Sequence, residues 1–133
     1  MLMMSRVEAI PFESMKLGMK WDWQTFPEWL DPLERTPLDI NVLSYVPISP
    51  IMITVMGLED AKNREPTPAE ITEMCRLWEE GLDAGGCGWS VPRLGKASAQ
   101  RDFDGKPTVT DEMSGDLCLA FAESVGRARG GRD

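Results

Sequence analysis

Four polar side chains stand where parallel α/β proteins commonly place their binding residues. Ser49 follows the first strand that we predict, and Ser90 and Arg93 stand at the end of the second. Arg101 lies in the polar loop after that strand. Because sites in such proteins form at the carboxyl ends of strands, the serines could hydrogen-bond a bound molecule and either arginine could pair with a carboxylate. The alternative is that the serines cap turns and the arginines are solvated.

The absence of histidine limits the chemistry of this chain more than any other feature. Without imidazole the chain can build neither a Ser-His-Asp nor a Cys-His device, and a metal ligand would have to be a cysteine or a carboxylate. The cysteines, Cys75, Cys87 and Cys118, form no C-x-x-C pair and have apolar neighbours. We expect buried free thiols in a reducing cytoplasm, the alternative being one reactive or metal-bound thiol. We assign no catalytic residue and no metal ligand.

The composition is that of a soluble globular chain with an acidic surface. Lys and Arg total 14 of the 133 residues and Asp and Glu total 22, so the net charge is −8. Such a surface repels phosphate groups, which disfavours nucleic acid and anionic membranes as partners. No apolar run approaches the ~18 residues of a membrane span, and the amino terminus lacks the basic region of a secretory signal. We therefore expect a cytoplasmic protein.

The spacing of apolar residues predicts three helices, at 26–35, 68–84 and 114–126. The first two begin with a Thr-x-x-Glu capping box that carries proline in its first turn, at 25–28 and 67–70. A glycine pair directly after the second helix supplies the left-handed conformation that commonly ends helices.

Two strands are predicted, at 40–46 and 87–91, because both runs are apolar and contain β-branched and aromatic residues. A helix, a glycine turn and a strand follow one another between residues 68 and 91, which is the second half of a βαβ crossover. We therefore expect the two strands to pair in parallel and the fold to be of the α/β class.

The connecting segments differ in character. The proline-rich residues 47–50 are expected to form a rigid turn, and the charged residues 59–66 a linker. Residues 51–56 have the composition of a strand but no clear pattern. The polar run 92–109 predicts a long loop, of the kind that is usually functional or mobile. The Gly/Arg-rich residues 127–133 are expected to be disordered.

An acidic turn within the long loop, Asp102-Phe103-Asp104-Gly105, has a spacing of acids and glycine that is found in calcium-binding loops. Too few oxygen ligands follow it, and no glutamate stands at the closing position of such a loop. A plain turn is therefore the favoured interpretation, and a calcium loop is the alternative.

Several short motifs follow one another along nearly the whole chain. They are MSRVE at 4–8, WDWQTFPE at 21–28, NV at 41–42, VMG at 55–57, REPTPAEI at 64–71, LDAGGCGWS at 82–90 and QRDFDG at 100–105. Each is short, but the ordered set resembles the N-acyl-D-amino-acid deacylase (D-aminoacylase-like) branch of the amidohydrolase superfamily.

The resemblance implies a metal-dependent hydrolase on a TIM-like (β/α)₈ barrel. Members of this family cleave a linear amide bond of an N-acyl amino acid and release an acyl acid and an amino acid. Zinc activates the attacking water, and an acidic residue carries the proton. On this resemblance, residues 1–126 are a partial barrel segment, and Ser49, Ser90, Arg93 and Arg101 are candidate substrate-binding residues.

The chain departs from the family pattern in ways that indicate an internal fragment. A barrel of this type needs ~250 residues and eight strands, whereas two strands are predicted here. The family's early His-x-His metal motif would lie before Met1, and its later metal histidines and catalytic acid beyond Asp133. Ile48 stands where the family often has a histidine. We do not transfer the family's metal-binding cysteine to any cysteine of this chain.

We therefore expect the isolated chain to be inactive and to bind no zinc, although zinc and an N-acyl amino acid would bind the complete family enzyme. The alternative is a non-catalytic α/β interaction domain, or a truncated product. In either case self-association or a partner chain would cover the open edges of its sheet.

Overall fold

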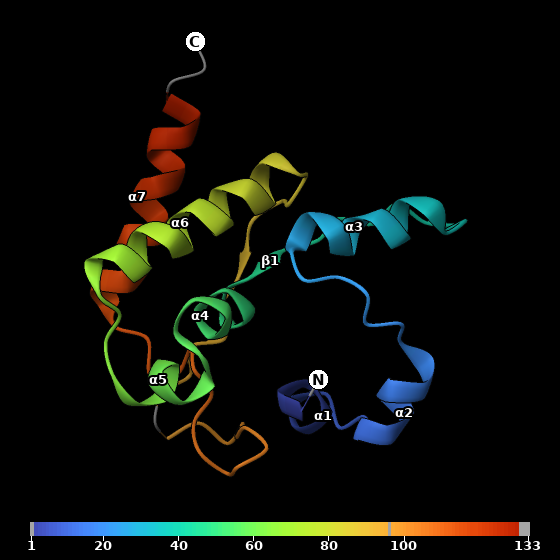
Figure 1. The fold of residues 1–133 in the computed structure, drawn as a ribbon, viewed down its shortest axis with the longest axis horizontal. Helices are drawn as coiled ribbons and strands as arrows, with labels where there is room; N and C mark the ends of the chain where they lie inside the picture. Colours follow the sequence, from blue (N-terminus) through green and yellow to red (C-terminus); the bar gives the residue numbers. More distant parts are fainter. Residues whose placement is uncertain (1, 96, 131–133) are drawn as a thin grey trace.

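The computed structural model describes residues 2–95 and 97–130, and for residues 127–130 only the backbone. This part of the chain is mostly helical and contains one small parallel sheet, which is not closed into a barrel (Figure 1). The helices are α1 (Leu2–Val7), α2 (Phe12–Gly18), α3 (Phe26–Arg35), α4 (Ile48–Met56), α5 (Leu58–Asn63), α6 (Pro68–Asp83) and α7 (Gly115–Gly130). The strands are β1 (Val46–Pro47) and β2 (Trp89–Ser90). No helix within these ranges is long and apolar enough to cross a membrane.

The three predicted helices are confirmed as α3, α6 and α7, with bounds that differ by a residue or less except at the end of α7. Helix α7 continues to Gly130, past the predicted end at 126, and the expectation that residues 127–133 are disordered stays a prediction. Residues 131–133 lie outside the described residues.

Both predicted capping boxes are present. The Glu28 amide donates to the Thr25 hydroxyl at 3.4 Å, while the Thr25 amide donates to the Glu28 carboxylate at 3.0 Å. Thr67 and Glu70 exchange the same two bonds at the start of α6, at 3.3 and 2.7 Å. These bonds satisfy amides that have no partner within the helix, so the first turn of each helix is fixed by local sequence.

Two predicted connections are wrong, because residues 47–63 are largely helical. The expected turn at 47–50 is the start of α4, which begins at Ile48, and the run 51–56 completes that helix. Pro50 fits there because amides in the first turn of a helix make no bond within the helix. The expected linker at 59–66 contains α5. Burial favours the helix over a strand at residues 51–56, because Ile51, Met52 and Met56 lie in the core.

The parallel pairing of the two strands is confirmed, with Val46 opposite Trp89 and Pro47 opposite Ser90. The strands are shorter than the predicted 40–46 and 87–91. Before the ladder, the Cys87 amide donates to the Ser44 carbonyl at 2.9 Å, but residues 40–43 have no neighbouring strand in the described part of the chain. A β-strand is stabilised by pairing, so the prediction fails where the partner strand is lacking.

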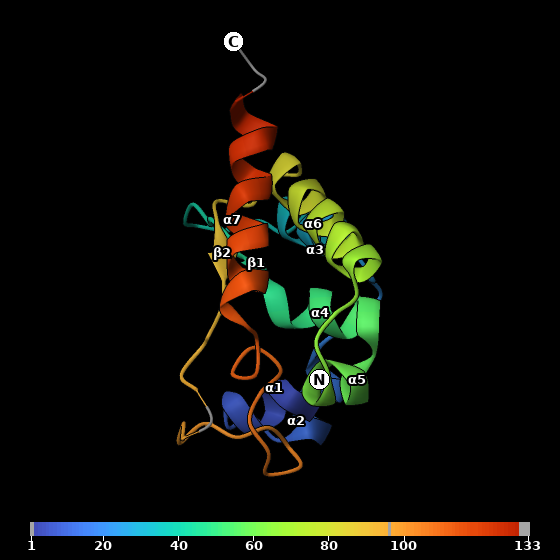
Figure 2. The ribbon, with the colours of Figure 1, turned by 90° about the vertical axis from the view of Figure 1, so that its left-hand side faces the viewer.

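The core lies between the sheet and the helices α4, α6 and α7, which pack against one another (Figure 2). Val46, Met74, Leu117 and Phe121 are among its most deeply buried side chains. All of these helices lie toward one face of the sheet, and no described element covers the opposite face. Leu43 and Tyr45, whose side chains alternate with that of Val46, are 80% and 61% exposed.

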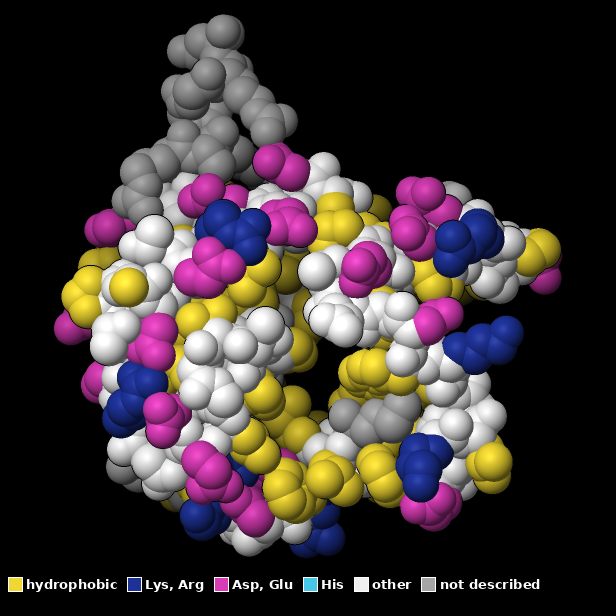
Figure 3. All heavy atoms as spheres, viewed as in Figure 1, with side chains coloured by type: hydrophobic (Ala, Val, Ile, Leu, Met, Phe, Trp, Pro, Cys, Tyr) yellow, Lys and Arg dark blue, Asp and Glu magenta, His cyan; other side chains and the backbone are white. Residues whose placement is uncertain are grey.

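The amino-terminal helices stand apart from this core. Helices α1 and α2 pack mainly against each other, and residues 19–25 connect them to α3. Figure 3 shows a hollow between this part of the chain and the remainder, with hydrophobic side chains around it. The elements that determine the candidate site are therefore α4 to α7 and the two strands.

We predict that Gly81→Ala destabilises the protein by roughly 1–3 kcal/mol, because a side chain there would overpack the core. An added Cβ would lie 2.9 Å from both methyl groups of Val46. Urea unfolding followed by circular dichroism measures the change. Gly126→Ala is the matched control in α7, because nothing lies within 4 Å of its position, and it should leave stability unchanged or raise it. Equal stability of the two variants would contradict this packing of Val46 on α6.

The pH dependence of stability gives a second prediction. Hydrogen bonds from Arg64 and from the Thr67 amide lower the pKa of Glu70 from 4.5 to about 2. Because the folded pKa is lowered, this stabilisation is present above pH 4.5 and is lost as the pH falls toward 2. Arg64→Gln should raise the pKa of Glu70 in an NMR titration and weaken the acid dependence of unfolding. Arg76→Gln, which removes the pairs with Glu73 and Glu80, should leave that pKa unchanged.

Candidate functional site

A cluster of buried polar side chains lies beyond the carboxyl ends of both strands. Ser49, in the first turn of α4, is buried, and its hydroxyl lies 3.4 Å from that of Thr110. The Thr110 hydroxyl donates to the carbonyl of Pro92, just after β2, at 2.6 Å. Because that bond uses the only proton of Thr110, Ser49 is the donor in the first contact. The long loop thus returns to join the ends of β1 and β2.

Asp111 fixes the backbone of the same loop. Its buried carboxylate accepts hydrogen bonds from the amide of Leu94 at 2.7 Å and from the hydroxyl and amide of Thr108 at 3.0 and 3.3 Å. Three donors thus satisfy the oxygens of this buried carboxylate. The loop after β2 is therefore held at both of its ends, 94 and 108.

The structure connects two of the four predicted binding residues to this cluster. Ser49 bonds to Thr110 as described, and the Nε of Arg93 donates to the carbonyl of Met113 at 2.9 Å. Ser90 is exposed at the end of β2, and Arg101 is half-buried further along the loop. Neither of these makes a side-chain bond to Ser49 or Arg93. The polar edge is therefore built from Ser49, Arg93 and residues 108–113, of which the sequence analysis identified only the first two.

A buried ion pair, which the sequence analysis missed, anchors the middle of the loop. The Lys62 ammonium at the end of α5 lies 2.6 Å from an oxygen of Asp102 and 3.0 Å from one of Asp104. The side chains of Lys62 and Asp102 are 3% and 0% exposed, and the ring of Phe103 lies 5.4 Å from the ammonium. The predicted acidic turn is present, and its carboxylates surround an ammonium group. The spacing of the two acids was the available signal, although nothing in the sequence pointed to Lys62.

The charged forms of Lys62 and Asp104 are favoured in this cluster. Burial would lower the pKa of Lys62, but hydrogen bonds to Asp102 and Asp104 outweigh it and raise the pKa above its ordinary value. The Lys106 amide and the Lys62 ammonium both lower the pKa of Asp104. Lys62 and Asp104 are therefore ionised at neutral pH, and the cluster acts as a structural anchor rather than as a proton donor.

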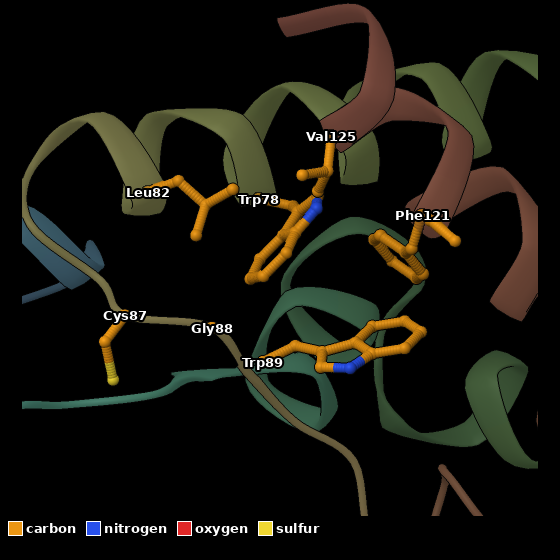
Figure 4. A pocket seen from close by; sticks show the side chains of 8 residues that line it. Trp78, Leu82, Cys87, Gly88, Trp89, Phe121 and Val125 are labelled. Atoms are coloured by element: carbon orange, nitrogen blue, oxygen red, sulfur yellow. The ribbon is translucent and has the colours of Figure 1, made fainter. Parts of the chain in front are cut away.

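Two cavities lie near these elements. The first, of about 300 Å³, is lined by aromatic and aliphatic side chains beside the amino end of β2, among them Trp78, Trp89 and Phe121 (Figure 4). Cys87 lies at its edge and is exposed, so the prediction that all the cysteines are buried is wrong for this residue, whereas Cys75 is buried. The second, of about 400 Å³, lies between α5 and the start of α7 and includes Arg64.

The polar cluster offers groups that can bind a small molecule. No group of three metal-binding side chains occurs among the residues that the structure describes, and the whole sequence lacks histidine. The available groups are hydroxyls, backbone carbonyls, the Asp111 carboxylate and the exposed Arg93 side chain. Of these groups, Arg93 can pair with an anion.

These features define a mostly helical protein with a polar cluster at the carboxyl edge of a small parallel sheet. Part of the chain is similar to uncharacterized mycobacterial proteins. Uncharacterized protein Rv2913c of Mycobacterium tuberculosis and an uncharacterized protein of Mycobacterium bovis are each 38% identical to it over 91 residues, 65% of this chain. The matched region is only 15% of each relative, so the chain spans a small part of their length. No protein-family model and no solved structure matches the sequence significantly.

We predict that Lys62→Met destabilises the protein by about 3–5 kcal/mol, because it leaves the Asp102 carboxylate buried without a cation. Urea unfolding measures the change, and hydrogen exchange at the Phe103 amide should show the loop opening. Lys16→Met, which removes an exposed pair with Glu13, should cost about 0–1 kcal/mol. Adding Asp102→Asn to Lys62→Met should restore part of the loss. Equal effects of the two lysine variants would contradict the anchoring role.

Proposed function

We propose that this chain is an internal segment of a metal-dependent amidohydrolase of the D-aminoacylase-like branch, which cleaves linear amide bonds of N-acyl (D-)amino acids. In the complete enzyme the segment would contribute two strands, their helices and a substrate-side loop to a (β/α)₈ barrel. The observation that carries the proposal is the parallel sheet, which is covered by helices on one face only. The resemblance of the ordered motifs supplies the family.

The uncovered face supports the proposal on physical grounds. Parallel sheets occur almost only where both faces are buried, and their strands are continuously apolar for that reason. Leu43 and Tyr45 belong to such an apolar run but are largely exposed here. A relative several times longer than this chain has room for the missing strands. The 38% identity indicates that this region occurs in nature as part of a longer protein.

Within that enzyme we assign this chain a role in substrate binding. Arg93 uses only its Nε in the bond to Met113, so its terminal nitrogens are available to pair with the carboxylate of an N-acyl amino acid. Arg101, Ser90 and Ser49 are further candidates. Zinc, when bound by the complete enzyme, would supply an activated water. Its ligands would come from other segments, since this chain lacks a fitting set of ligands.

The remaining assignments follow from the same proposal. The substrate would be a small N-acyl amino acid, and neither nucleic acid nor a membrane would be a partner of this acidic chain. We propose a cytoplasmic location, in which the cysteines stay reduced. The competing proposal is a non-catalytic interaction domain, which the lack of histidine and the uncovered strand favour.

The test uses the mycobacterial relative. We expect the purified 133-residue chain to bind no stoichiometric zinc by metal analysis and to release no amino acid from N-acyl-D-amino acids. The full-length relative should bind zinc and hydrolyse at least one of these substrates. A chimera in which this chain replaces the matching segment should keep measurable activity. Zinc binding with hydrolysis by the isolated chain, or an inactive zinc-free relative, would contradict the proposal.

Single substitutions in that chimera test the binding role. Arg93→Ala should raise KM by about 10–100-fold with a smaller effect on kcat, as expected for a lost charged hydrogen bond to the substrate. Arg76→Ala, which removes an exposed arginine on α6, is the matched control and should leave KM unchanged. An unchanged KM for Arg93→Ala would contradict the binding role and would leave this arginine with a structural role in the loop.

A further inference from the structure

The outer edge of β1 carries unpaired backbone groups next to exposed apolar side chains. The Ser44 carbonyl and the Val46 amide point to β2, at 2.9 and 2.8 Å from their partners. Backbone groups alternate in direction along an extended chain, so those of Leu43 and Tyr45 point to the opposite edge. Within the described part of the chain these two residues make no backbone hydrogen bond, and the Tyr45 carbonyl has only a 3.4 Å contact with the Ser44 hydroxyl.

This edge lacks the features by which proteins usually block strand pairing. Natural edge strands carry charges, prolines or bulges that keep other strands away. No charged residue occurs between Asp39 and Glu59 in this otherwise acidic chain. Pro47 ends the exposed edge but leaves residues 41–45 open. Residues 41–45 are therefore an unpaired segment that can accept another strand and is not protected by charge.

We infer that this edge pairs with the same edge of a second copy of the chain. Two identical edges related by a two-fold axis meet in antiparallel orientation, which forms a continuous sheet in the order β2-β1-β1-β2. Leu43 and Tyr45 of one copy then exchange amide and carbonyl bonds with Tyr45 and Leu43 of the other, and Ser44 lies on the axis. This register places no proline opposite either donor. A register centred on Tyr45 would set Leu43 against Pro47, which has no amide proton.

The edge of β2 is a poorer candidate for the same pairing. Both strands are two residues long, but the unpaired residues 41–45 lengthen the edge of β1, whereas Pro92 closely follows β2. The chain beyond β2 is held in the loop by two hydrogen bonds. The Leu94 amide donates to Asp111, and the Pro92 carbonyl accepts from Thr110. Pairing through β1 therefore offers the longer edge and needs no change in the loop. The inference concerns the isolated chain, because in the complete barrel proposed above this edge would pair with a strand from another segment.

The oligomeric state in solution tests the inference. We expect light scattering after size exclusion to give the mass of two 14.9-kDa chains, with dissociation on dilution. Each copy carries a net charge of −8, so added salt should favour the dimer. Leu43→Pro removes an amide on the outer edge and should give a monomer. Val42→Pro, which removes an amide on the inner side, is the matched control and should stay dimeric.

Cross-linking tests the register. In a Cys87→Ser background, Ser44→Cys should form a disulfide-linked dimer on mild oxidation, because opposite residues of a non-hydrogen-bonded antiparallel pair lie ~4.5 Å apart at Cα. Val42→Cys in the same background should not, because its counterpart in the second copy lies several residues away. Circular dichroism checks that each variant is folded.

Three results would overturn the inference. The first is a wild-type monomer at every accessible concentration and salt level. The second is a dimer that Leu43→Pro leaves intact although the variant is folded. The third is equal cross-linking through positions 42 and 44. None of these results bears on the zinc and hydrolysis assays, so the two proposals can fail separately.

Discussion

The parallel pairing of β1 with β2 is the contact on which the rest of the structure depends. Val46 lies at its centre, with its amide bonded to Gly88 and its side chain fully buried. The side chain fits because Gly81 and Gly86 have no Cβ, and a Cβ on Gly86 would lie 2.5 Å from a methyl group of Val46. Because the pair is parallel, the chain leaves both strands at the same edge, where α4 and the long loop begin.

The loop after β2 is then fixed by two separate polar clusters. The pair of Lys62 with Asp102 holds its middle to α5, and Asp111 holds its ends. Burying this ion pair costs desolvation free energy, and leaving one buried charge without its partner costs more. The pair therefore favours the one loop conformation in which Lys62 and Asp102 meet. Arg93 therefore projects from a backbone with a defined position, which is the requirement for binding an anion with little loss of entropy.

The sequence predicted those elements whose stability is local. The capping boxes of Thr25 and Thr67 fixed the starts of α3 and α6, and the glycines after α6 fixed its end. The helix α4 was missed because isoleucine, valine and threonine favour strands, and here burial against α6 overrides that preference. The pair of Lys62 with Asp102 joins residues far apart in the chain, so no local pattern could reveal it. Among the candidate site residues, Ser49 and Arg93 bond to the polar cluster, because both lie close to a strand end, and their role in substrate binding stays a prediction.

The residues before β1 show why a segment with the composition of a strand can still form only a short strand. Residues 40–46 have the apolar character of a strand buried on both faces, but helices cover one face and β2 pairs one edge. A second copy at the outer edge would satisfy the free amides of Leu43 and Tyr45 and would leave their side chains exposed on the open face. A complete barrel would satisfy the amides and cover the side chains as well. Edge pairing and face burial are thus separate requirements, and the exposed apolar face is the feature that a dimer alone does not explain.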